Sequence, residues 1–390
     1  MRAFRAACAG QPGGRRRPRL ALEAAYAGGP PSGRCYKRRA ERLLELPIAV
    51  DATYSLDPEL TGIGVYSRRL LHGLATAHPE TRFRWCYRSH RWLTAFQQEA
   101  PPRNCWRGLL LESGVRRADL FHGLNQRLPR RTAVRTIATF HDLFVMTGEY
   151  STREFRERFT TQAQEAAARA DWIIAVSEFT ASQVNGLLGV SRDRIRVVPH
   201  GADRPPSVTP VGSRERLILH VGALQKRKNL VRLVEAFGAT PAGWRLALLG
   251  GDGYGSAEVH AAVEASPRRS DIVTPGYVPA EELAAYYRRA AIFAFPSLDE
   301  GFGIPVIEAM AWGMPVITSR ASALPEAAGG AAWLVDPLDT GELAAALRHL
   351  CDDESRRAAM AASGLVRVET AGWGEAVTKT WAIYREALQS

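Results

Sequence analysis

The arrangement of short apolar runs constrains the fold of this 390-residue chain more than any other feature. Runs of β-branched and apolar residues recur, and stretches with apolar residues at helical spacing separate them, which is typical of parallel sheets covered by helices on both faces. The pattern therefore predicts the α/β class. The expected strands are residues 47–50, 83–87, 119–122, 136–140, 171–176, 195–198, 216–221, 245–249, 292–296, 315–318 and 332–335.

A stretch rich in Pro and polar residues, 201–213, interrupts this pattern, and we expect an interdomain linker there. The length also fits two domains of about 150 residues each. We therefore expect one doubly wound, Rossmann-like domain over 47–205, a second over 213–374 and a last helix over 375–390. Two such domains are expected to face each other across a central cleft. Ligands would bind there, beyond the carboxyl ends of the parallel strands.

The first 46 residues differ in composition from the rest of the chain. From Met1 to Glu45 there are eleven Arg and Lys against three Glu, so this stretch carries +8 of the total formal charge of +11. With many Gly and Pro and little periodicity, it is interpreted as a basic disordered leader. It is interpreted either as a lipid-docking arm or as a tail without function, and the nearly neutral remainder argues against nucleic acid as a partner.

No stretch of about 18 apolar residues is present, so no membrane-spanning helix is expected. Glu23 interrupts the apolar residues behind the leader arginines, which argues against an export signal. The five cysteines are scattered without a CxxC pair, which suggests neither disulfides nor zinc. We expect a cytoplasmic protein that is either soluble or peripheral on the inner face of the plasma membrane.

A loop followed by a glycine-opened helix predicts an anion site in the second half. The strand ends near residue 296, Glu300 lies in the loop, and Gly301 and Gly303 precede a helix with Pro305 in its first turn. Glycines allow a phosphate to approach the backbone, and the free amides at the helix start stabilise its charge. Glu308, further along the helix, is suited to accept hydrogen bonds from ribose hydroxyls.

Clustered cations follow another strand of the same half. Gly222 ends the strand, and Lys226, Arg227 and Lys228 follow closely. Cations here suit a pyrophosphate leaving group, which gains negative charge as a glycosidic bond breaks. The alternative is a solvated basic face at a helix start.

Two features of the first half lie where strands meet helices. Gly62 and Gly64 form a Gly-x-Gly turn before a helical stripe, without the third glycine of a nicotinamide-binding fingerprint. His141 lies at the end of the strand 136–140, where its side chain would project into the cleft, although a lone histidine at a strand end is also a common structural feature.

The stretch Pro-Ser-x-x-Glu-Gly-Phe-Gly-x-Pro-x-x-Glu-Ala that contains Glu300 and Glu308 resembles the signature of glycosyltransferase family 4. The resemblance implies a GT-B fold and a retaining hexosyltransferase. It assigns Glu300 to the transferred sugar, Glu308 to the ribose and Lys228 to the diphosphate, with Arg227 as a second phosphate contact. His141 resembles the active-site histidine, which hydrogen-bonds the sugar or nearby backbone rather than acting as a simple base.

The same resemblance extends to the donor loops. It places Gly62, Gly64, Gly222, Phe302 and Val278 around the phosphates, the acceptor and the nucleobase, and implies that the last helix crosses back to the first domain. Many members carry an arginine after the glycine, where this chain has Ala223, which weakens a two-cation clamp unless Arg227 or Lys226 supplies the second charge.

The motif set most resembles α-mannosyltransferases that use GDP-mannose in the assembly of surface polysaccharides or lipid-linked glycans. The first domain would bind the carbohydrate or lipid-linked acceptor and the second the nucleotide sugar. No cofactor and no metal ion is expected, because no Asp-x-Asp or His cluster is placed to hold a cation on the diphosphate. Transfer from a UDP-hexose, and a sugar-nucleotide epimerase or hydrolase on the same scaffold, are the alternatives.

Overall fold

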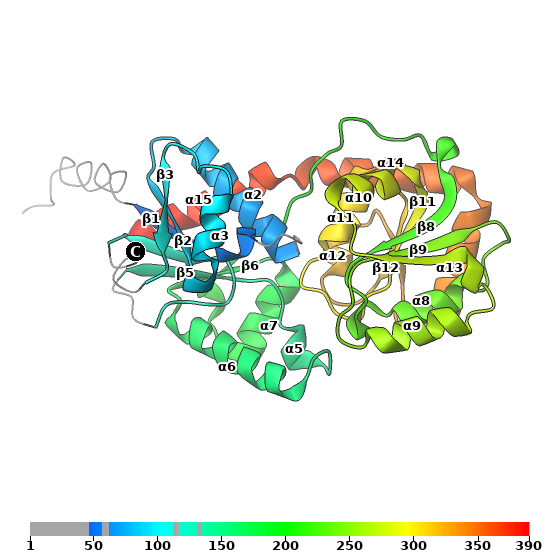
Figure 1. Cartoon of the computed structure of the whole chain (residues 1–390), viewed down its shortest axis with the longest axis horizontal. Helices are drawn as coiled ribbons and strands as arrows, with labels where there is room; N and C mark the ends of the chain where they lie inside the picture. The colour runs from blue at the N-terminus through cyan, green and yellow to red at the C-terminus, as the bar shows by residue number, and fades with distance from the viewer. Residues whose placement is uncertain (1–46, 57–61, 112–114, 116, 131–133, 390) are drawn as a thin grey trace, which may run out of the picture. The chain divides into compact units, whose positions relative to one another are not determined.

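The computed structural model describes residues 47–56, 62–111, 115, 117–130 and 134–389. The basic leader expected over 1–46 lies outside them. Two parallel sheets, each covered by helices, follow one another along the chain (Figure 1). Both sheets lie in one structural unit.

The first sheet has the strand order β3-β2-β1-β4-β5-β6-β7 and is parallel throughout. Chain order reverses between β1 and β4, which makes this the topological switch point. Its strands are β1 (Ile48–Asp51), β2 (Phe83–Tyr87), β3 (Cys105–Leu109), β4 (Leu120–Gly123), β5 (Arg135–Phe140), β6 (Trp172–Ala175) and β7 (Ile195–Val197). The helices of this half are α2 (Gly62–Ala77), α3 (Trp92–Gln97), α5 (Phe144–Thr147), α6 (Arg153–Arg169) and α7 (Glu178–Leu188).

The second sheet repeats the pattern with the order β10-β9-β8-β11-β12-β13, and its switch point lies between β8 and β11. Its strands are β8 (Glu215–Val221), β9 (Arg245–Leu249), β10 (Ile272–Gly276), β11 (Ala290–Phe295), β12 (Val316–Ser319) and β13 (Trp333–Val335). The helices are α8 (Leu230–Phe237), α9 (Ser256–Ala265), α10 (Ala280–Arg289), α11 (Ile304–Ala311), α12 (Leu324–Ala328), α13 (Thr340–Asp352), α14 (Glu354–Arg367) and α15 (Trp373–Gln389).

Short 3-10 helices complete the chain, and one of them carries the clustered cations. They are η1 (Thr53–Leu56), η2 (Ser89–Arg91), η3 (Arg192–Arg194), η4 (Val211–Ser213), η5 (Lys226–Lys228), η6 (Arg269–Asp271) and η7 (Val368–Thr370). The expected strands are present, with two additions: β3 and β10 were not expected from the sequence. Each is the edge strand of its sheet.

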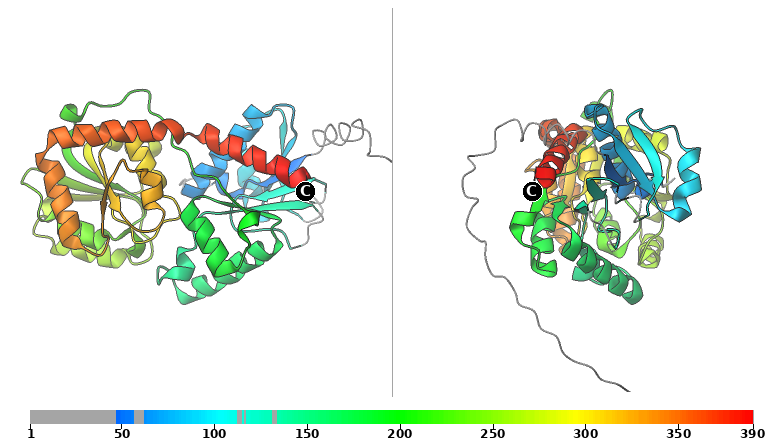
Figure 2. Two further views of the ribbon diagram at one scale, coloured as in Figure 1. Left: turned by 180° about the vertical axis from the view of Figure 1, so that it is seen from behind. Right: turned by 90° about the vertical axis from the view of Figure 1, so that its left-hand side faces the viewer.

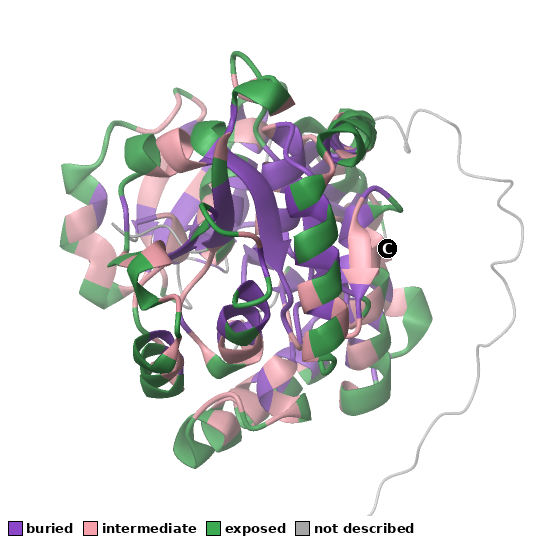
Figure 3. Ribbon diagram, turned by 90° about the vertical axis from the view of Figure 1, so that its right-hand side faces the viewer, coloured by how far each residue is buried: buried purple, intermediate pink, exposed green. Residues whose placement is uncertain are grey.

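Helix packing follows the apolar stripes of the sequence. In α2 the side chains of Tyr66, Leu70 and Leu74 are buried, as the helical spacing predicts. The helix begins at Gly62, so the two glycines expected in a turn before it form its first turn instead. Ser177 caps α7 by accepting a hydrogen bond from the Thr180 amide. In Figure 3 central strands are buried, whereas the covering helices alternate buried and exposed faces.

The last helix, α15, packs against the first sheet rather than the second (Figure 2). Tyr384 donates to or accepts from Nδ1 of His122 on β4 at 2.7 Å, and Trp381 stacks on His78 at 3.8 Å between ring centroids. Gly201, in the connection between the two halves, lies against the start of α15, where a Cβ would come within 2.3 Å of the Trp373 nitrogen. The chain therefore crosses between the halves at two adjoining segments.

Candidate functional site

The acidic loop expected from the sequence lies at the switch point of the second sheet. It leaves the carboxyl end of β11 and reaches α11, and it adjoins the turn after β8 that leads into η5. The Glu300 amide donates to the hydroxyl of Ser322 at 3.0 Å, and the Glu300 carbonyl accepts from Ala323 at 3.3 Å. These two bonds fix the loop backbone at the position from which the carboxylate projects.

Glu300 forms a buried charge cluster with the two cations of η5. Nζ of Lys228 lies 2.6 Å from Oε1 of Glu300, and Nη1 of Arg227 lies 2.8 Å from Oε2. The cations rest on aromatic rings: Lys228 on Phe295 at 4.6 Å and Arg227 on Phe144 at 4.5 Å. The two cations therefore share one carboxylate.

The pKa values in the cluster follow from this sharing. Burial disfavours the charged form of Glu300, but Arg227 and Lys228 outweigh it and lower its pKa to about 2. Burial and the charge of Arg227 lower the pKa of Lys228 to about 8 even though Glu300 opposes the change. At neutral pH all three groups are therefore charged.

One glycine and one asparagine give the cluster its local geometry. Gly222 adopts φ +151°, and a Cβ there would lie 3.4 Å from Cε of Lys228, so the lysine stem runs alongside the glycine. Asn229 ends η5 in the left-handed conformation and donates to the carbonyls of Pro296 and Pro337. These bonds tie η5 to the loop after β11.

The start of α11 matches the expected glycine-opened helix. Gly303 caps it with φ +104°, and Pro305 lies in its first turn. Glu308 is half-buried and accepts a hydrogen bond from the hydroxyl of Tyr287 at 3.2 Å. Burial, with a small addition from Asp203, raises the pKa of Glu308 to about 7, although the bond from Tyr287 opposes it.

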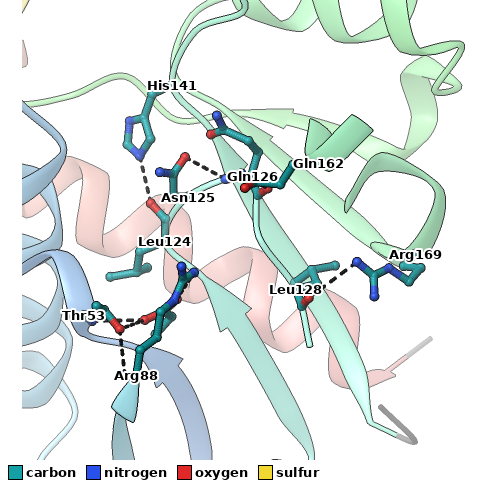
Figure 4. Close-up of polar contacts among 10 residues, drawn as sticks. Thr53, Arg88, Leu124, Asn125, Gln126, Leu128, His141, Gln162 and Arg169 are labelled. Atoms are coloured by element: carbon teal, nitrogen blue, oxygen red, sulfur yellow. Dashed lines mark hydrogen bonds and ion pairs between the residues drawn. The ribbon is translucent and has the colours of Figure 1, made fainter. Parts of the chain in front are cut away.

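His141 follows the carboxyl end of β5 and has both ring nitrogens engaged. Nε2 lies 2.8 Å from the carbonyl of Leu124 (Figure 4), and Nδ1 lies 3.3 Å from Nε2 of His200. A carbonyl only accepts, so Nε2 of His141 carries the proton and Nδ1 accepts from His200. Burial lowers the pKa of His141 to about 4. The ring is therefore neutral and held in one tautomer.

The backbone of His141 joins the two halves of the site. A Cβ on Gly301 would lie 1.6 Å from the His141 carbonyl oxygen, so only glycine fits there. The Gly301 carbonyl accepts from the hydroxyls of Ser177 at 2.6 Å and Thr180 at 3.0 Å. The smallness of Gly301 therefore serves contact with the first half, whereas the sequence suggested access for a phosphate.

The structure brings together most of the residues expected in the site, but not all of them. Glu300, Lys228, Arg227 and Gly222 share one cluster, and Gly301 links it to His141. Phe302 is buried against the ring of His200, and Val278 is buried in the hydrophobic core of the second half. Gly64 is buried inside α2. Gly62 lies at the start of this helix, where an added Cβ would come within 3.5 Å of Cδ1 of Ile304.

Two carboxyl groups near the cluster were not expected from the sequence. Burial raises the pKa of Asp142 to about 6, with Glu300 and Asp299 adding to it and Arg227 opposing it. Asp299 accepts from the hydroxyl of Thr147 at 2.7 Å, and its backbone carbonyl accepts from Arg227 at 3.0 Å. Each is the immediate sequence neighbour of an expected site residue, and this position was the feature of the sequence by which it could have been found.

Two further properties concern only the part of the chain that the structure describes. No group of three or more His, Cys, Asp or Glu side chains there is arranged to hold a metal ion. None of the described helices is both long enough and apolar enough to span a bilayer.

The fold and this charge cluster define a glycosyltransferase of the GT-B class, with two Rossmann-like domains. The model of Glycosyltransferase Family 4 matches residues 62–204, and that of Glycosyl transferases group 1 matches residues 206–365. The chain is 31% identical over 282 residues to an O-antigen chain mannosyltransferase B of Escherichia coli, covering 68% of this chain and 74% of that one. It belongs to the family 4 glycosyltransferases.

Other relatives and solved structures extend the comparison. An MMP alpha-(1->4)-mannosyltransferase of Mycolicibacterium hassiacum is 32% identical over 247 residues, which are 59% of this chain and 57% of that relative. Sucrose-phosphate synthase from Thermosynechococcus elongatus superposes with a TM-score of 0.71 at 22% identity, over 87% of this chain and 98% of the other. Anabaena HepE in complex with UDP and glucose superposes with a TM-score of 0.68 at 16% identity, over 87% of this chain and 100% of the other. At these identities the two structures show a shared fold.

Proposed function

We propose that this glycosyltransferase moves a mannosyl group from GDP-mannose, with retention of configuration, onto a hydroxyl of a glycan acceptor in surface polysaccharide or lipid-linked glycan assembly. The observation that carries the proposal is the buried cluster of Glu300, Lys228 and Arg227 at the switch point of the second sheet. The choice of mannose is supported by the mannosyltransferase relatives, including the O-antigen chain enzyme.

The two buried cations of the cluster suit a nucleotide-diphosphate leaving group. When a diphosphate binds, its oxygens compete with Glu300 for Lys228 and Arg227, and the carboxylate is released to accept hydrogen bonds from hydroxyls of the sugar. The free amides at the start of α11 add further stabilisation of the anion. Glu308, half-buried beside Tyr287, accepts from the ribose hydroxyls in this arrangement.

The contacts of His141 support a positioning role. Both of its nitrogens are occupied, so it has no free basic nitrogen for the acceptor hydroxyl unless the ring moves. Its carbonyl lies against Gly301, the neighbour of Glu300. In this proposal His141 holds the first half of the site against the sugar-binding loop, and the departing diphosphate receives the acceptor proton.

We propose that the transfer needs no divalent cation, because Lys228, Arg227 and the helix amides supply the charge that otherwise comes from Mg²⁺. Activity should then persist in excess chelator. Loss of activity that Mg²⁺ or Mn²⁺ restores would overturn this part.

The proposal as a whole is tested by incubating the full chain with mannose-terminated acceptors and each of GDP-mannose, UDP-glucose and UDP-galactose. The anomeric configuration of the product is then read by NMR. We expect transfer from GDP-mannose and an α-linked product. Transfer only from a UDP-hexose would overturn the donor, a β-linked product would overturn retention, and release of free or epimerised sugar without acceptor would favour the hydrolase or epimerase alternative.

A further inference from the structure

A second cationic site lies in the first half, apart from the Glu300 cluster. It is a cavity of about 400 Å³, lined by four arginines, one carboxylate and several uncharged residues. The charged residues are Arg88, Arg127, Arg130, Arg169 and Glu165, and the carboxylate of Glu165 is paired with Arg169. This volume lies within the range of about 300–1,000 Å³ found for small-molecule sites. Four arginines around one cavity are unexpected in a domain whose other charges are nearly balanced.

The cavity borders the switch point of the first sheet. Arg88 follows β2, Leu110 follows β3, and Arg127 lies in the segment after β4. The carboxyl ends of strands beside a switch point are where open α/β sheets bind ligands. The cavity therefore occupies the position in the first half that the Glu300 cluster occupies in the second.

Two of the four arginines are already paired within the protein. Arg88 donates to Oδ2 of Asp51 at 3.2 Å, and Oδ1 of Asp51 accepts from the amide and hydroxyl of Thr53 (Figure 4). Arg169 lies 3.4 Å from Glu165 and donates to the carbonyls of Leu128 and Pro129. These contacts fix two walls of the cavity without filling it.

Arg127 has one side-chain donor without a partner. Its Nε is buried and has no hydrogen-bond partner among the described residues. Burial, with the charge of Arg88 adding to it, lowers the pKa of Arg127, so the folded protein holds this cation at a cost. Several described arginines have a buried Nε of this kind, and Arg127 is the one among them that lines the cavity. The hydrogen bond that this Nε loses on burial is not replaced by water. An oxyanion in the cavity would replace it.

The same segment connects the cavity to the transfer site. The carbonyl of Leu124 accepts a hydrogen bond from His141 (Figure 4), and Arg127 follows Leu124 by three residues in the sequence. Three residues span at most about 11 Å, so the cavity lies close to the reacting end of the site.

We propose that this cavity binds a phosphate group of the acceptor, with Arg127 as its principal contact and Arg88 and Arg130 as supporting cations. Calling the ligand an acceptor rests on the proposed transferase function, but the binding of phosphate does not. The planar guanidinium fork matches the oxygens of a phosphate, and the cavity has room for part of the group that carries it.

The first arm of the test measures binding without catalysis. Inorganic phosphate and pyrophosphate are titrated by calorimetry into the full chain, with the donor site saturated by the nucleoside diphosphate that the protein binds. We expect one saturable site that weakens about tenfold or more in Arg127→Gln and less in Arg127→Lys, which keeps the charge. Arg103→Gln is the matched control, because Arg103 is exposed before β3 at the other end of that strand. Equal affinity in Arg127→Gln and wild type, or no saturable site for either anion, would overturn the proposal.

The second arm concerns the acceptor. Kinetics with matched glycans that do or do not carry a terminal phosphate ester should show a KM for the phosphorylated glycan that rises in Arg127→Gln with kcat nearly unchanged. The unphosphorylated glycan should show no such rise. If phosphate binds but the ester has no effect on KM, the assignment of the ligand as an acceptor is overturned and the phosphate site is not. If no donor supports transfer, this counts against the proposed function and leaves the first arm valid. Thermal unfolding of each variant confirms that it is folded.

Discussion

Replacing Glu300 by glutamine should separate the stability of the charge cluster from its catalytic use. Glutamine keeps the shape of the side chain and an acceptor oxygen, but removes the charge that compensates Lys228 and Arg227. Since both cations are buried, they would be left with an excess of like charge. We therefore expect Glu300→Gln to destabilise the ligand-free protein, to keep or strengthen nucleoside diphosphate binding, and to abolish most of the turnover.

The expected size of each effect of Glu300→Gln follows from the contacts of the cluster. The lowering of the Glu300 pKa from 4.5 to about 2 corresponds to about 3 kcal/mol in favour of the charged form, at about 1.4 kcal/mol for each pH unit. Breaking a buried pair typically costs about 3–5 kcal/mol, and the retained acceptor oxygen places this change near the lower value. Turnover should fall by about a hundredfold or more, since a contact to the transferring sugar is lost. Affinity for GDP should rise up to about tenfold, because the diphosphate no longer competes with a carboxylate.

Urea unfolding with and without GDP measures the first two effects, and initial rates measure the third. Saturating GDP should restore more stability in the variant than in the wild type, because binding to the folded state adds RT ln(1 + [L]/Kd). Glu258→Gln, an exposed carboxylate in α9, is the matched control and should change none of these quantities. Unchanged stability of Glu300→Gln, or weaker GDP binding than in the wild type, would refute the reasoning.

Three further outcomes follow from the same contacts. Lys228→Ala should weaken GDP binding about ten- to a hundredfold by calorimetry and leave guanosine binding unchanged, and equal loss for both ligands would remove the lysine from the phosphate site. Gly301→Ala, compared with Gly186→Ala in open space, should lower the free energy of unfolding by about 1–3 kcal/mol, since its Cβ meets the His141 carbonyl. The free energy of unfolding should fall as the pH is lowered from about 6.5 to 4, at roughly 3 kcal/mol per pH unit near pH 5, because the unfolded chain binds protons at four histidines that burial keeps neutral in the folded chain. Asp142 and Glu308 are protonated first in the folded chain, and their proton uptake offsets about half of this loss of stability. Unfolding monitored by fluorescence at several pH values measures the effect, and a flat profile would contradict it. The four histidines are His122, His141, His200 and His220.

The strands predicted from the sequence include central strands that are buried throughout and two partly exposed edge strands, β7 and β13. Every residue of β1 and β11 is buried, and both strands are apolar except for Asp51 at the end of β1. The two missed strands are edges: β3 contains Gly108 and is mostly half-buried, and β10 contains Pro275 and a register shift. A half-exposed edge carries polar residues, glycine and proline without penalty, so its sequence lacks the pattern by which a strand is identified.

The residues of the site could be proposed from the sequence, but not their contacts. The family resemblance assigned Glu300 to the transferred sugar and Lys228 to the diphosphate, and the two residues lie 72 positions apart in the sequence. Both follow adjacent strands at a switch point, which predicts proximity, yet direct pairing depends on how each loop turns. The same holds for Gly301, whose contact with His141 depends on the packing of two separately folded loops.

A buried polar chain explains why the C-terminal helix belongs to the site. His122 of β4 contacts Tyr384 of α15 through Nδ1, and through Nε2 the hydroxyl of Thr139, which also meets the hydroxyl of Tyr66 at 3.0 Å. All four side chains are almost fully buried, so each polar atom needs the next one as its partner. Thr139 lies on β5, two residues before His141, which follows that strand. Loss of Tyr384 would therefore leave His122 unsatisfied and loosen the strand that presents His141. The last helix thus holds the first half of the site in place, although it follows the second domain in the chain.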